Sequence, residues 1–189
     1  MKSLRIVALA AAVGLGATSF AALTPAFAEA TVEVGGAPMY PSKNIIENAV
    51  NSKDHTTLVV AVKAAGLVET LSGPGPFTVF APTNGAFDKL PAGTVDTLLK
   101  PESKAALTGV LTYHVVAGKI SAADLVAKIK AGGGKAVLKT VAGGEITASE
   151  EGGKVVITDA NGGKATVTIA DVNQKNGVIH VIDTVLLPK

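Results

Sequence analysis

The chain contains no cysteine and no tryptophan, and its only arginine is Arg5. Without cysteine there is no thiolate nucleophile, no cysteine-based metal site and no disulfide, so packing alone must hold the fold. Arginine is the side chain best suited to paired hydrogen bonds with phosphate and carboxylate groups. Because arginine is nearly absent and the lysines form no basic cluster, the sequence predicts no nucleic-acid partner and no strong binding to anionic lipid.

Motifs of catalysis are also missing from the sequence. There is no G-x-S-x-G, no H-E-x-x-H, no Walker A sequence and no G-x-G-x-x-G. Residues 159–162 lack the alternating oxygen ligands of a calcium loop, and their flanks predict a hairpin turn instead. We therefore expect no catalytic residue, no cofactor and no metal.

The three histidines lie far apart in the sequence. His55 precedes a helical pattern and is expected to be exposed, whereas His114 and His180 lie in apolar runs that predict strands. The favoured interpretation is that each makes structural hydrogen bonds in a half-buried sheet. A less favoured alternative is a copper site in which Met39 and Tyr40 join a histidine.

Residues 1–28 have the pattern of a secretory signal peptide. Lys2 and Arg5 form a positive segment, an apolar run follows from Ile6, and residues 26–28 form a small-x-small cleavage site. We expect cleavage between Ala28 and Glu29, and hence a secreted or periplasmic protein that does not span a membrane. Two of the 17 basic residues lie in this segment, which leaves 15 lysines against 15 acidic residues.

The rest of the chain predicts one domain. Glycine and proline in residues 29–41 indicate an extended N-terminal arm, and residues 42–189 form a single domain. In its first half, Ser42 is expected to cap one helix, Asp54 another that ends at Gly66, and Ser121 a third through a capping box with an acid three residues later.

The second half predicts mainly strands. Alternating apolar patterns indicate strands over residues 77–81, 113–116, 136–141, 145–149, 154–158, 164–170, 178–182 and 184–187. Glycine pairs separate most of the later segments and predict tight hairpins. Helices followed by hairpins favour an α+β domain, with a mainly antiparallel sheet covered by helices.

Three segments together resemble the fasciclin (FAS1) family. Residues 77–87, FTVFAPTNGAF, resemble its first conserved box; residues 111–116, LTYHVV, its tyrosine-histidine motif; and residues 176–183, NGVIHVID, its second box. The resemblance covers about Asn44 to Lys189 and is closest to small single-domain bacterial members. It implies a wedge-shaped antiparallel β-sandwich flanked by short helices, and a role in adhesion.

The resemblance also singles out two groups of residues. The residues expected to be structural are Phe77, Val79, Pro82, Thr83, Asn84, Phe87, Tyr113, His114, Gly177 and His180. Among these, Thr83 or Asn84 is expected to cap the helix that follows. The residues at positions of the family's recognition motifs are Tyr113, His114, Asp171 and Val172, the last two interpreted as an exposed acid beside an aliphatic residue.

Three hypotheses of function follow. The favoured one is an extracytoplasmic adhesion or protein-interaction module with a protein or cell-surface partner, acting as a monomer or weak oligomer without catalysis. The first alternative is a periplasmic binding protein for a small ligand, lipid or metal. The weakest is an enzyme that uses His114 with an acid such as Asp171, because the sequence alone does not bring these side chains together.

Overall fold

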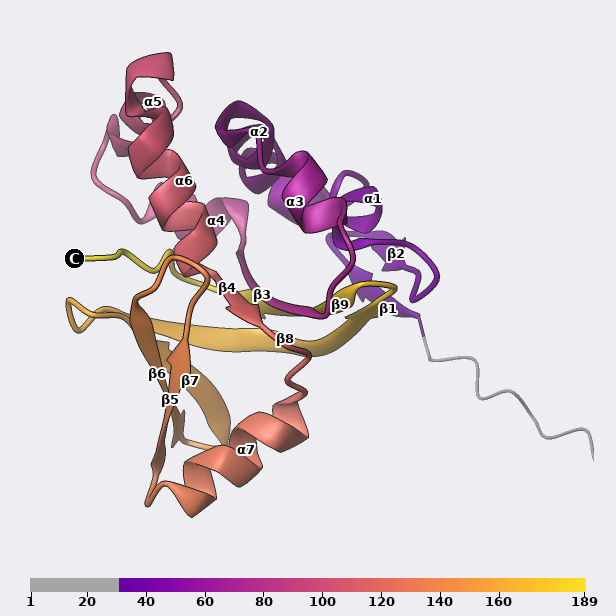
Figure 1. Ribbon diagram of the computed structural model, residues 1–189, viewed down its shortest axis with the longest axis vertical. Helices are drawn as coiled ribbons and strands as arrows, with labels where there is room; N and C mark the ends of the chain where they lie inside the picture. Colours follow the sequence, from indigo (N-terminus) through magenta and orange to yellow (C-terminus); the bar gives the residue numbers. More distant parts are fainter. Residues whose placement is uncertain (1–30) are drawn as a thin grey trace, which may run out of the picture.

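The computed structural model describes residues 31–189 (Figure 1). The predicted signal peptide and its cleavage site lie outside these residues and remain predictions. No helix in the described part of the chain has both the length and the apolar character that a membrane span requires. The described chain folds into short helices, a seven-stranded sheet and a two-stranded sheet.

The main sheet has seven strands in the order β4-β3-β9-β8-β7-β6-β5. Its β3 and β9 run parallel, and every other neighbouring pair is antiparallel. The bounds are β3 Phe77–Pro82, β4 Val115–Ala117, β5 Lys135–Lys139, β6 Glu145–Glu151, β7 Lys154–Thr158, β8 Lys164–Gln174 and β9 Gly177–Ile182. The mainly antiparallel α+β class predicted from the sequence is confirmed.

The long strand β8 joins the two halves of this sheet. Its first residues pair with β7, and its later residues pair with β9. Register shifts on either side of Ile169 bend the strand between these two pairings, as β-bulges do. The two edges of the sheet meet where Val116, in the middle of β4, bridges to Thr140 just after β5, so the sheet folds back on itself as a sandwich.

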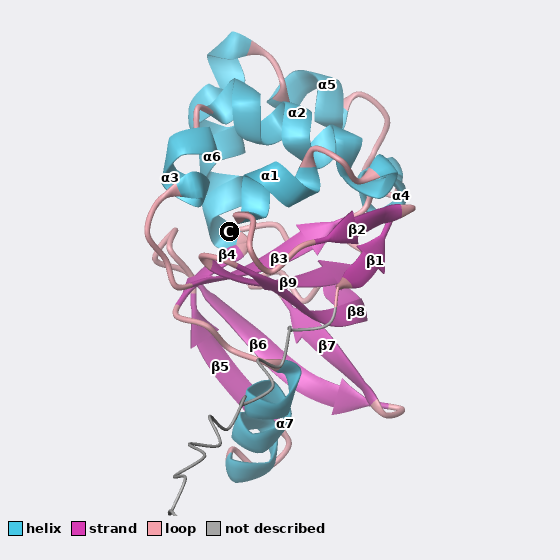
Figure 2. Ribbon diagram, turned by 90° about the vertical axis from the view of Figure 1, so that its right-hand side faces the viewer, coloured by secondary structure: helices cyan, strands magenta, loops and turns pink. Residues whose placement is uncertain are grey.

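The helices divide into two groups. The bounds are α1 Ile45–Ala49, α2 Thr56–Ala65, α3 Val68–Ser72, α4 Asn84–Asp88, α5 Thr94–Leu98, α6 Lys104–Tyr113 and α7 Ala122–Ala131. Helices α1–α6 gather on one side of the sheet, and α7 lies apart on the other (Figure 2). Each group covers a separate apolar cluster: one beneath α1–α6 against β3 and β9, the other between α7 and the hairpins β5–β8.

The helix ends confirm some capping predictions and correct others. Ser121 caps α7 in the predicted capping box with Asp124, and Gly66 ends α2 in the left-handed conformation. Asn44, and not Ser42, caps α1, because its side chain accepts from the backbone of Glu47 while the Glu47 carboxylate accepts in return. Asp54 does not cap α2: it lies inside a 3-10 turn, Lys53–His55, that leads into the helix.

Two segments differ from their predicted structure. Residues 29–41 were expected to extend as an arm, but β1 Val32–Val34 and β2 Ala37–Met39 pair as a hairpin. Its inner side chains, Val34 and Met39, are buried in the core, which makes the hairpin part of the packed unit. The last segment, residues 184–187, is not a strand, although Val185 and Leu186 are buried.

Candidate functional site

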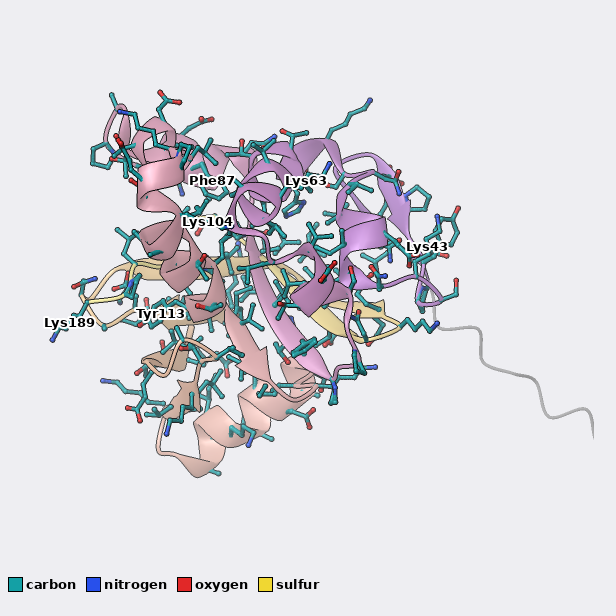
Figure 3. The ribbon with its side chains drawn as sticks, turned by 45° about the horizontal axis from the view of Figure 1, so that its top comes forward. Lys43, Lys63, Phe87, Lys104, Tyr113 and Lys189 are labelled. Carbon is teal, nitrogen blue, oxygen red and sulfur yellow. The ribbon has the colours of Figure 1, made fainter. Side chains whose placement is uncertain are left out.

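Tyr113 is the last residue of α6, not the first of a strand as predicted, and it is 1% exposed. Its hydroxyl donates to the carbonyl of Glu145 at 2.7 Å and accepts from the backbone of Ala160 at 3.0 Å. The ring therefore ties the end of α6 to the start of β6 and to the turn after β7, where α6 meets the sheet (Figure 3). In this position it offers no surface to a partner.

His114 caps the end of the same helix and is also buried. Its Nδ1 donates to the carbonyl of Val110 at 2.7 Å, and its Nε2 accepts from the backbone N–H of Leu186 at 2.9 Å. Both ring nitrogens are thus used in the neutral form. Burial lowers the pKa of His114 to about 4, and the nearby Val110 carbonyl and Asp159 oppose this shift only in part.

His180, in β9, is fully buried and stacks on Phe80 with ring centroids 5.7 Å apart. Its Nε2 donates to the carbonyl of Ile120 at 2.8 Å, and its Nδ1 accepts from the backbone N–H of Asp171 at 3.3 Å. Burial lowers the pKa of His180 as well. Both histidines therefore make the structural hydrogen bonds that the sequence predicted, although His114 caps α6 and only His180 lies in a strand.

Asp171 and Val172 do not form the exposed pair expected at this position. Asp171 lies at φ 55° in the bulged part of β8, and its Oδ1 accepts from the backbone N–H of Ala122 at 2.7 Å, at the first turn of α7. Val172 points into the core and is 1% exposed, so the aliphatic member of the expected contact pair is buried. The bulge rotates the strand between these two residues, which the sequence pattern does not show. A role in recognition for either residue remains a prediction.

His55 differs most from its prediction, because it is 3% exposed. Its Nδ1 lies 2.9 Å from the Ser52 hydroxyl, while Nε2 has no hydrogen-bond partner within the described residues. Burial lowers its pKa, and the Ala81 backbone and Asp54 oppose this shift without reversing it. The ring is buried because the β1–β2 hairpin, expected to extend away, covers it together with α1 and the sheet.

The metal and lipid alternatives gain little support from the cavities. Met39 and His55 line the same apolar cavity, but its volume is about 20 Å³, and an adjoining apolar cavity measures about 30 Å³. Each has room for about one or two small molecules of the size of water. Within residues 31–189, no three side chains of histidine, aspartate or glutamate are grouped as metal ligands.

Neither Thr83 nor Asn84 caps α4 with its side chain, contrary to the expectation from the sequence. The side chain of Thr83 makes no capping hydrogen bond to α4. The Oδ1 of Asn84 instead accepts from Thr57 at 3.0 Å and from the Thr56 hydroxyl at 3.1 Å, and its Nδ2 donates to the Lys53 carbonyl at 2.8 Å. Asn84 thus caps α2 through Thr57, which lies 27 positions earlier in the chain. This contact fixes α2 against the first box.

Asn176 is a structural residue that the sequence reasoning did not single out. Its Oδ1 accepts from the backbone of Ile45 at 3.1 Å, and its Nδ2 donates to the carbonyls of Leu71 and Gly73 at 2.7 and 3.0 Å. One amide therefore joins α1, α3 and the β8–β9 turn. Its place directly before Gly177 in the second box was the available signal, because polar turn residues often bond to the backbone.

A cavity of about 570 Å³ lies beside Asn176. It is lined by the start of α1, by residues 72–76, by Lys119 and by residues 174–177. Of the residues predicted to matter, only Gly177 touches it. Sequence reasoning missed this cavity because four separate segments form it, and none of them has a motif of its own.

Tyr113→Phe is expected to lower the free energy of unfolding by about 1–3 kcal/mol, because it leaves the Glu145 carbonyl and the Ala160 N–H without their partner. The ring itself remains packed. Urea denaturation monitored by circular dichroism measures the change. Tyr40→Phe is the matched control, since Tyr40 is 43% exposed and its hydroxyl makes no hydrogen bond in the described chain; equal stability losses in both variants would contradict the assignment.

Asp171→Ala is expected to lower the free energy of unfolding by about 2 kcal/mol, because it removes the acceptor of the Ala122 N–H at the first turn of α7 and places alanine at a positive φ. Asp171→Asn retains an acceptor oxygen and tolerates this backbone conformation, so its loss should stay below about 1 kcal/mol. Amide hydrogen exchange at Ala122 and in the first turn of α7 reports the effect directly. Unchanged protection in Asp171→Ala would show that the carboxylate does not hold the helix.

Comparison with known proteins gives a consistent result. The model of the fasciclin domain family matches residues 53–188. Protein sll1483 of Synechocystis is 47% identical over 187 residues, which is 97% of this chain and 96% of that protein. The immunogenic protein MPB70 of Mycobacterium bovis is 35% identical over 181 residues, 93% of this chain and 82% of that protein.

A solved structure shows the same fold. The FAS1 domain pair from the insect cell adhesion molecule fasciclin I superimposes with a TM-score of 0.68 at 24% sequence identity. The match covers 77% of this chain and 51% of that one, so this chain spans about half of the two-domain structure.

Proposed function

The chain belongs to the fasciclin domain family, and from that premise we propose that it is an extracytoplasmic adhesion module that binds a protein or cell-surface partner without catalysis. Such a module acts through a rigid surface whose contacts combine an apolar centre with a polar rim. The predicted signal peptide would place it in the periplasm or outside the cell.

The observation that carries this proposal is the burial of the motif side chains. Tyr113, His114 and His180 have their polar atoms bonded within the fold. These hydrogen bonds stabilise the fold, and the three side chains therefore place no reactive group at the surface. The enzyme hypothesis also loses its motivation, because Asp171 bonds to α7 and both nitrogens of His114 bond to the backbone.

The names of similar proteins support the same direction. MPB83 of Mycobacterium bovis, named a cell surface glycolipoprotein, is 38% identical over 122 residues, 65% of this chain and 48% of that protein. The structural neighbour is described as a cell adhesion molecule. A surface or secreted role for the present chain agrees with both names.

Attachment of a deletion strain tests the proposal. Cells that lack the protein should form less biofilm and attach less to surfaces or neighbouring cells, and the full-length gene should restore attachment. A copy without residues 1–28 should fail to restore it, because the protein would not be exported. Normal attachment by the deletion strain would count decisively against an adhesion role.

A crosslinking pull-down from intact cells tests the predicted contact at Asp171. Asp171→Asn is the informative variant, because it removes the charge while the amide oxygen can still cap α7. Val172→Ala is unsuitable, since Val172 lies in the core and its truncation would change stability. Partners that persist with Asp171→Asn would exclude the carboxylate as a contact, and partners that disappear would support it.

A further inference from the structure

The cavity of about 570 Å³ beside Asn176 has the size of a small-molecule site, for which several hundred cubic ångströms are typical. The start of α1, the segment after α3 and the β8–β9 turn enclose it, and these elements lie on the same side of the molecule (Figure 1). Its floor is rigid, because Gln174 and Asn176 are buried there and bond to neighbouring segments.

The polar groups still available at its wall are mainly hydrogen-bond donors. The Oδ1 of Asn44 is used as the cap of α1, which leaves its Nδ2 to donate outward. The Lys175 ammonium and the Ser72 hydroxyl also line the cavity, and neither has a hydrogen-bond partner among residues 31–189. These donors, together with the positive charge of Lys175, favour an anionic group on the ligand.

The other residues that line the cavity favour a ligand with hydroxyl groups and apolar surface in addition to an anionic group. Glu47 is the one acidic residue of the lining, and only its Oε2 is used in the capping box of α1. Its other oxygen can accept a hydrogen bond from a hydroxyl group. Pro74 and Pro76 supply apolar surface on which the C–H face of a sugar ring can pack. A carboxylate joined to a hydroxyl-rich ring can use all three features of the wall: the donors, the Glu47 acceptor and the apolar proline surface.

We propose that this cavity binds an acidic saccharide of the uronic-acid class, with the carboxylate at Lys175, Asn44 and Ser72 and a ring hydroxyl at Glu47. The proposal rests on the proposed adhesion function and names its partner as a carboxylate-bearing polysaccharide at a cell surface. Recognition by the cavity needs none of the side chains of the family's motifs, which the fold buries.

Lys175 is a suitable position for the test because it is exposed and its backbone N–H is held by the carbonyl of Lys43, labelled in Figure 3, at 2.8 Å. Replacing its side chain leaves that bond intact. The matched control is Lys63→Gln, an equal loss of charge on α2, which lines no part of the cavity (Figure 3). Equal melting temperatures for both variants should show that the fold is unchanged.

Isothermal titration calorimetry of residues 29–189 with tetragalacturonate gives the primary measurement. We expect binding that weakens about tenfold in Lys175→Gln, as the loss of one charge-assisted hydrogen bond predicts, and that is unchanged in Lys63→Gln. A neutral tetrasaccharide should bind at least about tenfold more weakly than tetragalacturonate. No measurable binding of tetragalacturonate at millimolar concentration, or equal affinity of Lys175→Gln and the unmodified protein, would overturn the proposal.

Further probes separate a saccharide from other anions. Glu47→Gln can still complete the capping box, but it replaces the free acceptor oxygen with a donor. This variant should bind tetragalacturonate more weakly and inorganic sulfate more tightly than the unmodified protein does. Tetraglutamate or sulfate bound as tightly as tetragalacturonate would reject the saccharide class. Failure of all these arms while the deletion strain still loses attachment would refute this site and leave the adhesion proposal standing.

Discussion

Alanine in place of Gly177 is expected to destabilise the protein by about 4 kcal/mol or more, a large part of the roughly 5–15 kcal/mol that is typical of a folded domain. A Cβ at this position would lie 2.0 Å from the carbonyl oxygen of Phe77, a backbone atom that no rotamer change can move. Phe77 and Gly177 are register partners at the start of the parallel pair β3–β9, the second and third strands of the sheet. Relieving the clash therefore requires the two strands to separate.

Gly109→Ala is the control, because a Cβ in that part of α6 would meet no atom within 4 Å. Its φ is not positive, so alanine should stabilise the helix by about 0.5–1 kcal/mol. Urea denaturation of both variants gives effects of opposite sign. A Gly177→Ala protein within 1 kcal/mol of the original would mean that the strands can separate at this point with little loss.

Acidification below pH 6.5 is expected to remove about 3 kcal/mol of stability through His114 alone. The folded state keeps the ring neutral down to a pKa of about 4, whereas the unfolded chain takes up a proton near 6.5. The contribution is fully present above pH 6.5 and is lost as the pH falls toward 4. His55 and His180 also have lowered pKa values, so they add losses of the same sign.

Protonation also disrupts a hydrogen bond at His114 and another at His180. A second ring proton on His114 would face the N–H of Leu186, and one on His180 would face the N–H of Asp171, so each hydrogen bond would become a clash of two donors. Acid should therefore first loosen the C-terminal segment and the junction with α7. Hydrogen exchange at Leu186 and Ala122 between pH 7 and pH 5 would detect it.

Urea titrations at pH 7.5, 6.5, 5.5 and 4.5 measure the effect on stability. Each buried histidine contributes a slope of up to about 1.4 kcal/mol per pH unit in this range. His114→Gln should be less stable than the original at pH 7.5 but should lose less stability on acidification. Parallel pH profiles for the two proteins would assign the acid sensitivity to other groups.

Local sequence patterns determined a large part of this structure. The capping box of Ser121, the end of α2 at Gly66 and the hairpins β5–β8 depend on residues within a few positions of one another, and the structure confirms them. The Asp159 turn is of the same kind, because its Oδ1 accepts from Asn161 and Gly163. The family boxes likewise identified the fold, since they are continuous in sequence.

Tertiary contacts decided what each side chain does. His55 follows a helix-start pattern typical of the surface, but the hairpin β1–β2 buries it, and Asn84 caps a helix that precedes it by 27 residues. Val172 was interpreted as the aliphatic partner of Asp171 in a contact pair, but in the bulged strand β8 it points into the core.

The sequence by itself determined the α+β class, the family and the absence of cysteine chemistry, because each depends on composition or on short, continuous patterns. Only the tertiary structure decided which residues face the solvent and which surround the cavity beside Asn176. Asn176 and Ile45 bond across 131 positions, and no local pattern encodes such a contact. The surface available to a partner is set by how the segments meet, and therefore lies beyond what periodicity and motifs can specify.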